Sequence, residues 1–305
     1  MVVINAIINS VYSQTIIRFS LKSINIKPYI KPFITLGVYQ FLTSMYISFN
    51  VAYLGFVCGE TEVGLYTTAT KLFTIILSFY TAFTGVMLPR MSSIIARGQI
   101  NEFKGLVYKS LDLLFSIAFP LLIISEVYAS DIIHIIAGNE YSSSVLPMRI
   151  IMPLLFIIGY EQVMIIQILT PLKKDKAILI NSCLGAILSV IFNLLLVKNY
   201  GAIGSSFVWI ICEIAVLCSA QFFVNKYIDF KFPWKSVLIR LFISIAIIAF
   251  ASFIKHSLKG LVLPLVVGAS ISAILYFIAE VYILKNTTIV TILLQIVSKC
   301  KRLYH

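Results

Sequence analysis

Three ionisable residues lie inside long apolar stretches of the sequence. Lys71 lies about a third of the way along "GLYTTATKLFTIILSFYTAFTGVMLP" (64–89), Glu161 lies in "PLLFIIGYEQVMIIQILTPLKKDK" and Glu213 lies in "GSSFVWIICEIAVL". A charged side chain at the centre of a membrane helix costs roughly 2.5–3.5 kcal/mol on insertion scales, so it is usually kept for a substrate or ion pathway. A lysine can hold an anionic substrate, and a carboxylate can carry a coupling proton. These three residues are the first candidates for function.

Lys71 belongs to a stripe in which every residue is polar or small. Steps of four and three along its helix give Thr67, Lys71, Thr74, Ser78, Thr81 and Gly85. This spacing puts the stripe on one helix face. We predict that the stripe lines a cavity in which Lys71, Thr67, Thr74 and Ser78 contact an anionic substrate. In the alternative, the small residues allow close helix packing, and Lys71 extends to headgroups about 12 Å away along the helix.

The preceding apolar stretch carries a second stripe of the same spacing: Tyr39, Thr43, Tyr46, Asn50 and Tyr53. Tyrosine rings can stack on sugars and an amide can hydrogen-bond to them. We therefore predict that Tyr46 and Asn50 contact the substrate. Tyrosines near span ends are also typical of membrane interfaces, which is the alternative interpretation.

The two buried carboxyl groups allow three interpretations. Glu161 and Glu213 can pair with Lys71, carry a coupling proton, or stay protonated and hydrogen-bonded as packing contacts between helices. We predict an ion-coupling role for both.

Composition defines the setting of these residues. Of the 305 residues, 60% are hydrophobic and 12% are charged, and the mean hydropathy is +1.00. These values predict an all-α integral membrane protein, because a hydrocarbon core about 30 Å thick needs roughly 20 apolar residues per helix. We expect about eight membrane spans near 33–57, 63–88, 110–128, 150–169, 177–197, 203–224, 237–254 and 261–284. Residues 2–17 form a further apolar segment without signal-peptide features, which we interpret as the end of a partial helix.

The basic residues indicate the orientation of the spans. Most of the 24 Lys and Arg residues lie in alternate loops near 18–31, 90–109, 173–176, 226–240 and 285–302. The intervening loops carry only Arg149, Lys198, Lys255 and Lys259. The positive-inside rule therefore predicts that the first set of loops and the C-terminus are cytoplasmic. Topology and attraction to anionic lipid account for the net charge of +12, so no nucleic-acid partner is expected.

Neither an enzyme nor a metal site is predicted. The loops are short, which leaves no room for a catalytic domain outside the membrane. The five cysteines and three histidines show no metal-ligand spacing, and no glycine-rich phosphate loop is present. We expect no cofactor, and any function must lie among the helices.

Several short motifs occur in an order that resembles a known family. The segments "LGFVCGETEVGLYTTATKLF", "VMLPRMSS" and "LTPLKKDKAILINSCLGAILSVIFNLLLVKNYGAIGSSFVWIICE" resemble, over about residues 30–225, the C-terminal half of polysaccharide-lipid flippases. These are the Wzx-like O-antigen transporters of the multidrug/oligosaccharidyl-lipid/polysaccharide (MATE-like) superfamily. The resemblance implies two six-helix bundles around a central cavity, often with two additional helices. It implies the tail of a preceding helix and a loop at 1–32, the second bundle at 33–232, and two additional helices with a basic tail at 233–305.

The resemblance also implies roles for individual residues. The family pattern "VGxYxxAxK", whose lysine contributes to a cationic cavity, falls on Val63, Gly64, Tyr66, Ala69 and Lys71. An "LPRxS" turn falls on Leu88, Pro89, Arg90 and Ser92, which adds Arg90 to the substrate contacts, and an acidic position of the twelfth helix falls on Glu213. Where many relatives have Asp, this chain has Asn50, so no carboxylate acts there.

The implied function is the transfer of undecaprenyl-pyrophosphate-linked oligosaccharide across the bacterial inner membrane for O-antigen, capsule or exopolysaccharide synthesis. Most of the first bundle has no counterpart in the chain. We expect a second copy, a separately encoded half, or the surviving part of a broken or wrongly started gene. The expected partners are the anionic lipid-linked oligosaccharide, membrane lipids and glycan polymerase or ligase machinery. Two alternatives stay open: a drug or cation antiporter of the same superfamily, and a non-transporting fragment or assembly partner of glycan enzymes.

Overall fold

The computed structural model describes residues 27–258 and 260–285, and these residues form helices joined by short connections. The predicted partial helix at 2–17 lies outside the described residues. The helices are α2 (Lys27–Cys58), α3 (Glu60–Ala96), α4 (Ile100–Ala137), α5 (Val145–Ile151), α6 (Leu154–Gln162), α7 (Asp175–Phe192), α8 (Lys198–Ile228), α9 (Trp234–Ser257) and α10 (Val262–Tyr282). A 3₁₀ segment, η1 (Asn139–Ser144), precedes α5, and two π-helical segments, η2 (Val163–Leu169) and η3 (Asn193–Val197), extend α6 and α7.

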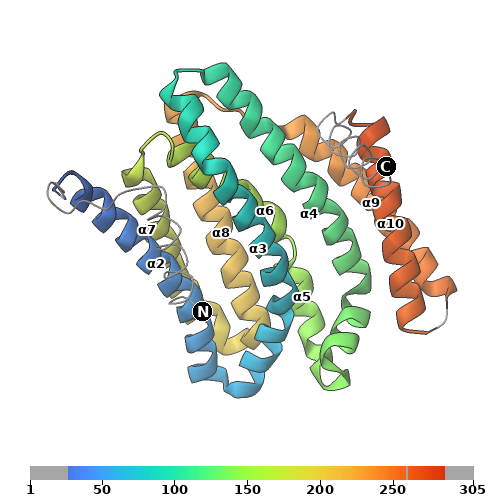
Figure 1. Ribbon diagram of the computed structural model, residues 1–305. Coiled ribbons are helices and arrows are strands. Elements are labelled where there is room, and N and C mark those ends of the chain that lie inside the picture. The colour runs from blue at the N-terminus through green and yellow to red at the C-terminus, as the bar shows by residue number, and fades with distance from the viewer. Residues whose placement is uncertain (1–26, 259, 286–305) are drawn as a thin grey trace, which may run out of the picture.

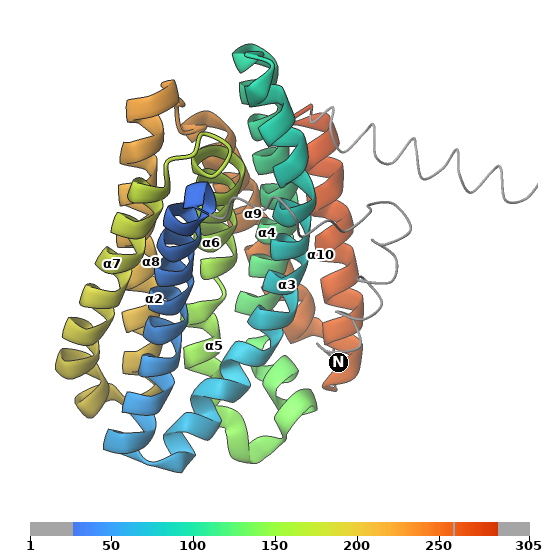
Figure 2. The same ribbon diagram turned by 60° about the vertical axis from the view of Figure 1, so that its left-hand side comes forward.

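The described helices confirm an all-α membrane protein. Six of them are long and apolar enough to cross a membrane, or seven spans if the bent pair Asn139–Ile151 and Leu154–Leu169 counts as one. Among these spans, residues Asp175–Ile228 form one continuous stretch of 54 residues. A straight helix of that length would measure about 80 Å, far more than a bilayer. Gly201 divides the stretch with φ 53° and ψ −130°, and α7 and α8 lie side by side, so the two count separately toward the eight predicted spans (Figures 1 and 2).

The break at Gly201 depends on a close contact with α3. The Glu62 carboxylate accepts a hydrogen bond of 2.7 Å from the backbone N–H of Ala202, so it caps the helix that starts there. A Cβ atom at Gly201 would lie 2.4 Å from Glu62 Oε2. Both the positive φ and this close approach require glycine. The cap therefore fixes the part of α8 that follows Gly201 against the start of α3.

The helices form two outer groups with a middle group between them. In Figure 1, α2, α7 and α8 lie on one side and the hairpin of α9 and α10 lies on the other, with α3, α6 and α4 between them. The buried core runs through the whole bundle, and its largest side chains include Tyr80, Tyr160 and Phe115. Helices α9 and α10 pack on each other and on α4.

Two local predictions differ from the structure. Helix α2 begins at Lys27, before the predicted start of the first span at residue 33. The predicted turn at Leu88–Ser92 lies inside α3, with Pro89 in the helix. A proline inside a helix removes one backbone hydrogen bond and crowds the carbonyl four residues earlier, but membrane helices tolerate it where neighbouring groups satisfy the freed backbone. Arg90 is therefore a residue on an exposed helix surface, not in a turn.

Candidate functional site

The polar stripe of α3 lies on the outside of the described bundle. The side chains of Lys71, Thr74, Ser78 and Thr81 are exposed, and Thr67 is partly exposed. The apolar face opposite carries Phe73 and Tyr80, which are buried in the core. Helical periodicity thus turns the predicted stripe away from the core, where another surface or an aqueous cavity can meet it.

The hydroxyl groups of the stripe donate to carbonyls of their own helix. Thr67 Oγ1 donates to Val63 O at 2.8 Å, and Thr74 Oγ1 donates to Lys71 O at 2.9 Å. Ser78 and Thr81 do the same with Ile75 O and Leu77 O. A hydroxyl whose proton is used in this way keeps acceptor lone pairs. The stripe therefore offers acceptor oxygens, suited to sugar hydroxyls, beside one cation.

Lys71 supplies the positive charge of this face. Among the residues that the structure describes, the ion pairs within 4 Å involve Arg240 and Lys255, and Lys71 takes part in none of them. The predicted alternative of a pair between Lys71 and Glu161 or Glu213 is thus not formed. The ammonium group is exposed and available to an anion from outside the bundle.

A small cavity opens beside the stripe, between α2, α3, α7 and α8. Its volume is about 100 Å³, and its lining includes Asn50, Tyr66, Thr74, Ser189 and Trp209. A volume of this size can hold a few waters. Two of the predicted substrate residues, Asn50 and Thr74, line this cavity.

Asn50 connects three helices. Its Nδ2 donates to the Tyr66 hydroxyl and to Ser205 O, both at 3.1 Å, and the side chain is buried. Both amide protons are therefore used within the protein. The Oδ1 atom is buried without a hydrogen-bond partner, so Asn50 can offer a ligand only an acceptor. The geometry favours a structural role for the Asn50 Nδ2 group and leaves Oδ1 free to accept one hydrogen bond.

The two predicted coupling residues contact each other. The Glu161 carboxyl group of α6 lies next to the Glu213 carboxyl group of α8. Glu213 is also held by Trp209, whose Nε1 donates to Glu213 Oε1 at 3.0 Å. Two carboxyl groups in contact repel each other when both are charged. Trp209 lines the cavity, and it therefore connects the cavity wall to this carboxyl pair.

The remaining predicted contacts lie apart from this group. The side chain of Tyr46 lies outside the described part of the structure, although its backbone belongs to α2. Arg90 lies near the end of α3, exposed, about 28 Å from Lys71 along the helix axis at 1.5 Å per residue. Lys71 and Arg90 are too far apart to hold one phosphate group together.

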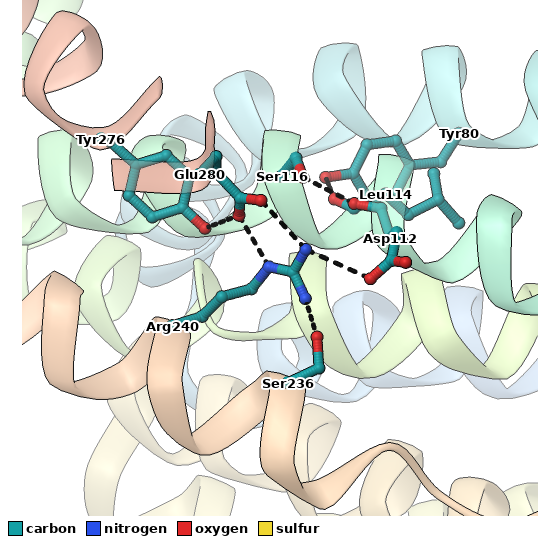
Figure 3. A network of polar contacts seen from close by, with 8 residues as sticks. All are labelled: Tyr80, Asp112, Leu114, Ser116, Ser236, Arg240, Tyr276 and Glu280. Carbon is teal, nitrogen blue, oxygen red and sulfur yellow. Dashed lines mark hydrogen bonds and ion pairs between the residues drawn. The ribbon is translucent and has the colours of Figure 1, made fainter. Parts of the chain in front are cut away.

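A buried ionic cluster was not predicted from the sequence. Asp112 and Glu280 were not among the residues predicted for function, and Arg240 was counted among the loop cations, yet Arg240 and Glu280 are fully buried. Figure 3 shows the guanidinium group of Arg240 between the two carboxylates, with Tyr276 and Ser236 beside them. A signal did exist: by the predicted topology, all three charges lie a few residues inside the same membrane face, at similar depth.

Comparisons with known proteins agree with this architecture. The profile of a family described as polysaccharide biosynthesis protein matches residues 1–146. Over 164 residues the chain is 31% identical to a protein of Escherichia coli (strain K12) named "Putative O-antigen transporter", and the match covers 52% of this chain and 39% of that protein. The chain resembles the polysaccharide-lipid flippases. The resemblance predicted from the sequence motifs is thereby confirmed.

The fold has a counterpart among solved structures. The lipid II flippase MurJ, in an inward closed conformation, superposes with a TM-score of 0.70 at 14% identity, over 86% of this chain and 54% of that chain. At this identity the likeness concerns the fold. The chain thus spans about half of MurJ and about two fifths of the O-antigen transporter that it matches.

Proposed function

We propose that this chain forms one half of a flippase that moves an undecaprenyl-pyrophosphate-linked oligosaccharide across the bacterial inner membrane. The observation that carries the proposal is the exposed polar stripe of α3, where a lysine without a carboxylate partner among the described residues lies between acceptor hydroxyls. A pyrophosphate group needs a cation, and sugar hydroxyls need acceptors. The flippase fold and the polysaccharide biosynthesis family profile support the same substrate class.

In the proposed mechanism, a second six-helix bundle covers the α3 stripe and completes the cavity. A second copy, a separate chain or a joined reading frame can supply it. The glycan enters from the cytoplasmic face, where the C-terminus also lies, and Lys71 holds the negative headgroup. Thr67, Thr74 and Ser78 accept hydrogen bonds from the sugar. The two bundles then rock against each other and release the glycan outward.

Coupling to an ion gradient is assigned to the carboxyl pair. Glu161 and Glu213 lie next to each other, and Trp209 connects the pair to the cavity wall. In the proposed coupling step, the pair binds one proton, and the loss of this proton leaves two negative charges in contact, which repel each other and separate α6 from α8. Protonation can therefore bias the bundle between two arrangements.

Restoration of surface glycan tests the proposal. The chain is expressed in bacteria that lack their compatible flippase, alone and joined to the reading frame upstream. Restoration by the chain alone indicates a flippase that works as an oligomer. Restoration only by the joined form indicates one half of a two-bundle protein, with glycan polymerase and ligase acting after it. If neither form restores glycan while both reach the membrane, the flippase proposal is wrong.

A further inference from the structure

Arg240 of α9 is buried where α9 contacts α10 and α4. Its side chain is 1% exposed, and the Glu280 side chain beside it is fully buried. A buried charge is retained only where it is fully paired, and breaking such a pair leaves an uncompensated charge. The transport steps proposed above do not use this cluster.

The guanidinium group makes its tightest contacts within the α9–α10 hairpin (Trp234–Tyr282). Its Nε donates to Glu280 Oε1 at 2.7 Å, and its Nη2 donates to Glu280 Oε2 at 3.1 Å. This is the bidentate geometry that guanidinium and carboxylate groups favour. The Tyr276 hydroxyl donates to Glu280 Oε1 at 2.8 Å, and Arg240 also donates to Ser236. These contacts join α9 to α10.

The same guanidinium group then reaches out of the hairpin to α4. Its Nη2 also donates to Asp112 Oδ1 at 3.2 Å, and its Cζ lies 5.8 Å from the centre of the Phe115 ring (Figure 3). The Asp112 side chain is 39% exposed, unlike Glu280. Arg240 therefore holds α9 to α10 and also links this hairpin to α4.

A second link fastens α9 to α4 near their other ends. Lys255 of α9 forms an ion pair of 2.6 Å with Asp131 and donates to Val127 O at 3.0 Å, both on α4. Beside it, the Tyr128 hydroxyl donates to Ala251 O at 3.2 Å. The two links show that α4 and α9 run in the same direction.

The spacing of the two links matches the membrane. Asp112 and Asp131 are about 28 Å apart along α4, and Arg240 and Lys255 are about 22 Å apart along α9, at 1.5 Å per residue. The hydrocarbon core is about 30 Å thick. The hairpin is therefore fixed to α4 near both boundaries of the hydrocarbon core. Two links this far apart oppose rotation of the hairpin relative to α4.

We propose that Arg240 is a positioning residue that fixes the α9–α10 hairpin to α4, so that the hairpin moves with its own bundle as one body. Helix α4 is the bundle helix on which α9 and α10 pack, so the motion of α4 determines the motion of the hairpin. The consequence for transport rests on the proposed flippase function. The fastening itself does not.

Distances between spin labels on α4 and α9 near Asp112 and Arg240, at the end away from the Lys255–Asp131 link, test the fastening in the full chain reconstituted in lipid. The variant is Asp112→Leu, which removes the link to α4 and leaves the Arg240–Glu280 pair intact, so the hairpin itself stays formed. The matched control is Glu126→Leu, which removes another carboxylate of α4 whose charge acts on Arg149. Wild-type and control proteins should each give a single narrow distance, identical with and without undecaprenyl pyrophosphate. Asp112→Leu should lose that narrow distance, and Asp112→Glu should restore it.

The outcomes separate this inference from the proposed function. A narrow distance retained in Asp112→Leu would overturn the assignment of Arg240 as the link. A wild-type distance that changes on addition of undecaprenyl pyrophosphate would overturn the one-body movement. In surface glycan assays, Asp112→Leu should lose transport at normal membrane abundance. Unchanged transport would mean that the Arg240–Asp112 link serves only helix packing. If the wild-type protein restores no glycan, the flippase proposal fails while the distance measurements still decide the fastening.

Discussion

Replacement of Lys71 by alanine is the sharpest perturbation of the proposed transport site. The ammonium group is exposed, and among the described residues no ion pair holds it, so its removal should cost the fold little. Lys71→Ala should therefore reach the membrane at wild-type abundance. Any loss of function would then report on the substrate and not on folding.

The size of the effect follows from the charge and its exposure. Two unit charges 4 Å apart attract by about 4 kcal/mol at an effective dielectric constant of 20. Water around the exposed Lys71 screens this attraction, so a hydrogen bond to a charged group, about 1.5–3 kcal/mol, is the better guide. Because each 1.4 kcal/mol is a factor of ten, Lys71→Ala should weaken headgroup binding by about 10- to 150-fold.

The assay is surface glycan restored in a flippase-deficient strain, normalised to membrane abundance, with substrate supply varied. Lys71→Arg keeps the positive charge and should retain most transport. Lys176→Ala removes an exposed lysine at the start of α7, away from the stripe, and should have no effect. Full transport by Lys71→Ala would refute the cavity assignment. Loss in both alanine variants would instead indicate a general dependence on surface charge.

Three further predictions concern the residues that shape the site. Gly201→Ala should lower stability by about 2–4 kcal/mol, because alanine is strained at this positive φ and its Cβ would displace the Glu62 cap; thermal unfolding in detergent measures this, and an unchanged midpoint would contradict it. Glu161→Gln replaces the carboxyl group by an amide, which can hydrogen-bond but does not titrate, so transport should become independent of external pH; a wild-type pH profile would remove the carboxyl pair from coupling. Asn50→Ala should cost about 1–3 kcal/mol of stability, because the Tyr66 hydroxyl and a backbone carbonyl lose their donor; a loss of transport at wild-type stability would instead assign Asn50 to the substrate.

Local periodicity was sufficient to place the polar face of α3. The residues from Thr67 to Thr81 share a face because a helix repeats every 3.6 residues, whatever surrounds it. The same local information gave the membrane spans, since the length of an apolar run is fixed by the thickness of the bilayer. The break near Gly201 separated two apolar runs in the sequence, and the positive φ of that glycine explains it.

The partners of buried polar side chains depended on the tertiary structure. Glu161 and Glu213 have similar depths in the sequence pattern, but only the packing of α6 on α8 brings their carboxyl groups together instead of pairing one with Lys71. Asp112 and Glu280 lie near the ends of predicted spans, where a side chain normally reaches water or headgroups. The packing of α9 and α10 on α4 buried Glu280 and aimed both carboxylates at Arg240. The sequence pattern sets the depth of a residue, whereas helix rotation and crossing decide which side chains meet, and these depend on contacts between segments far apart in the chain.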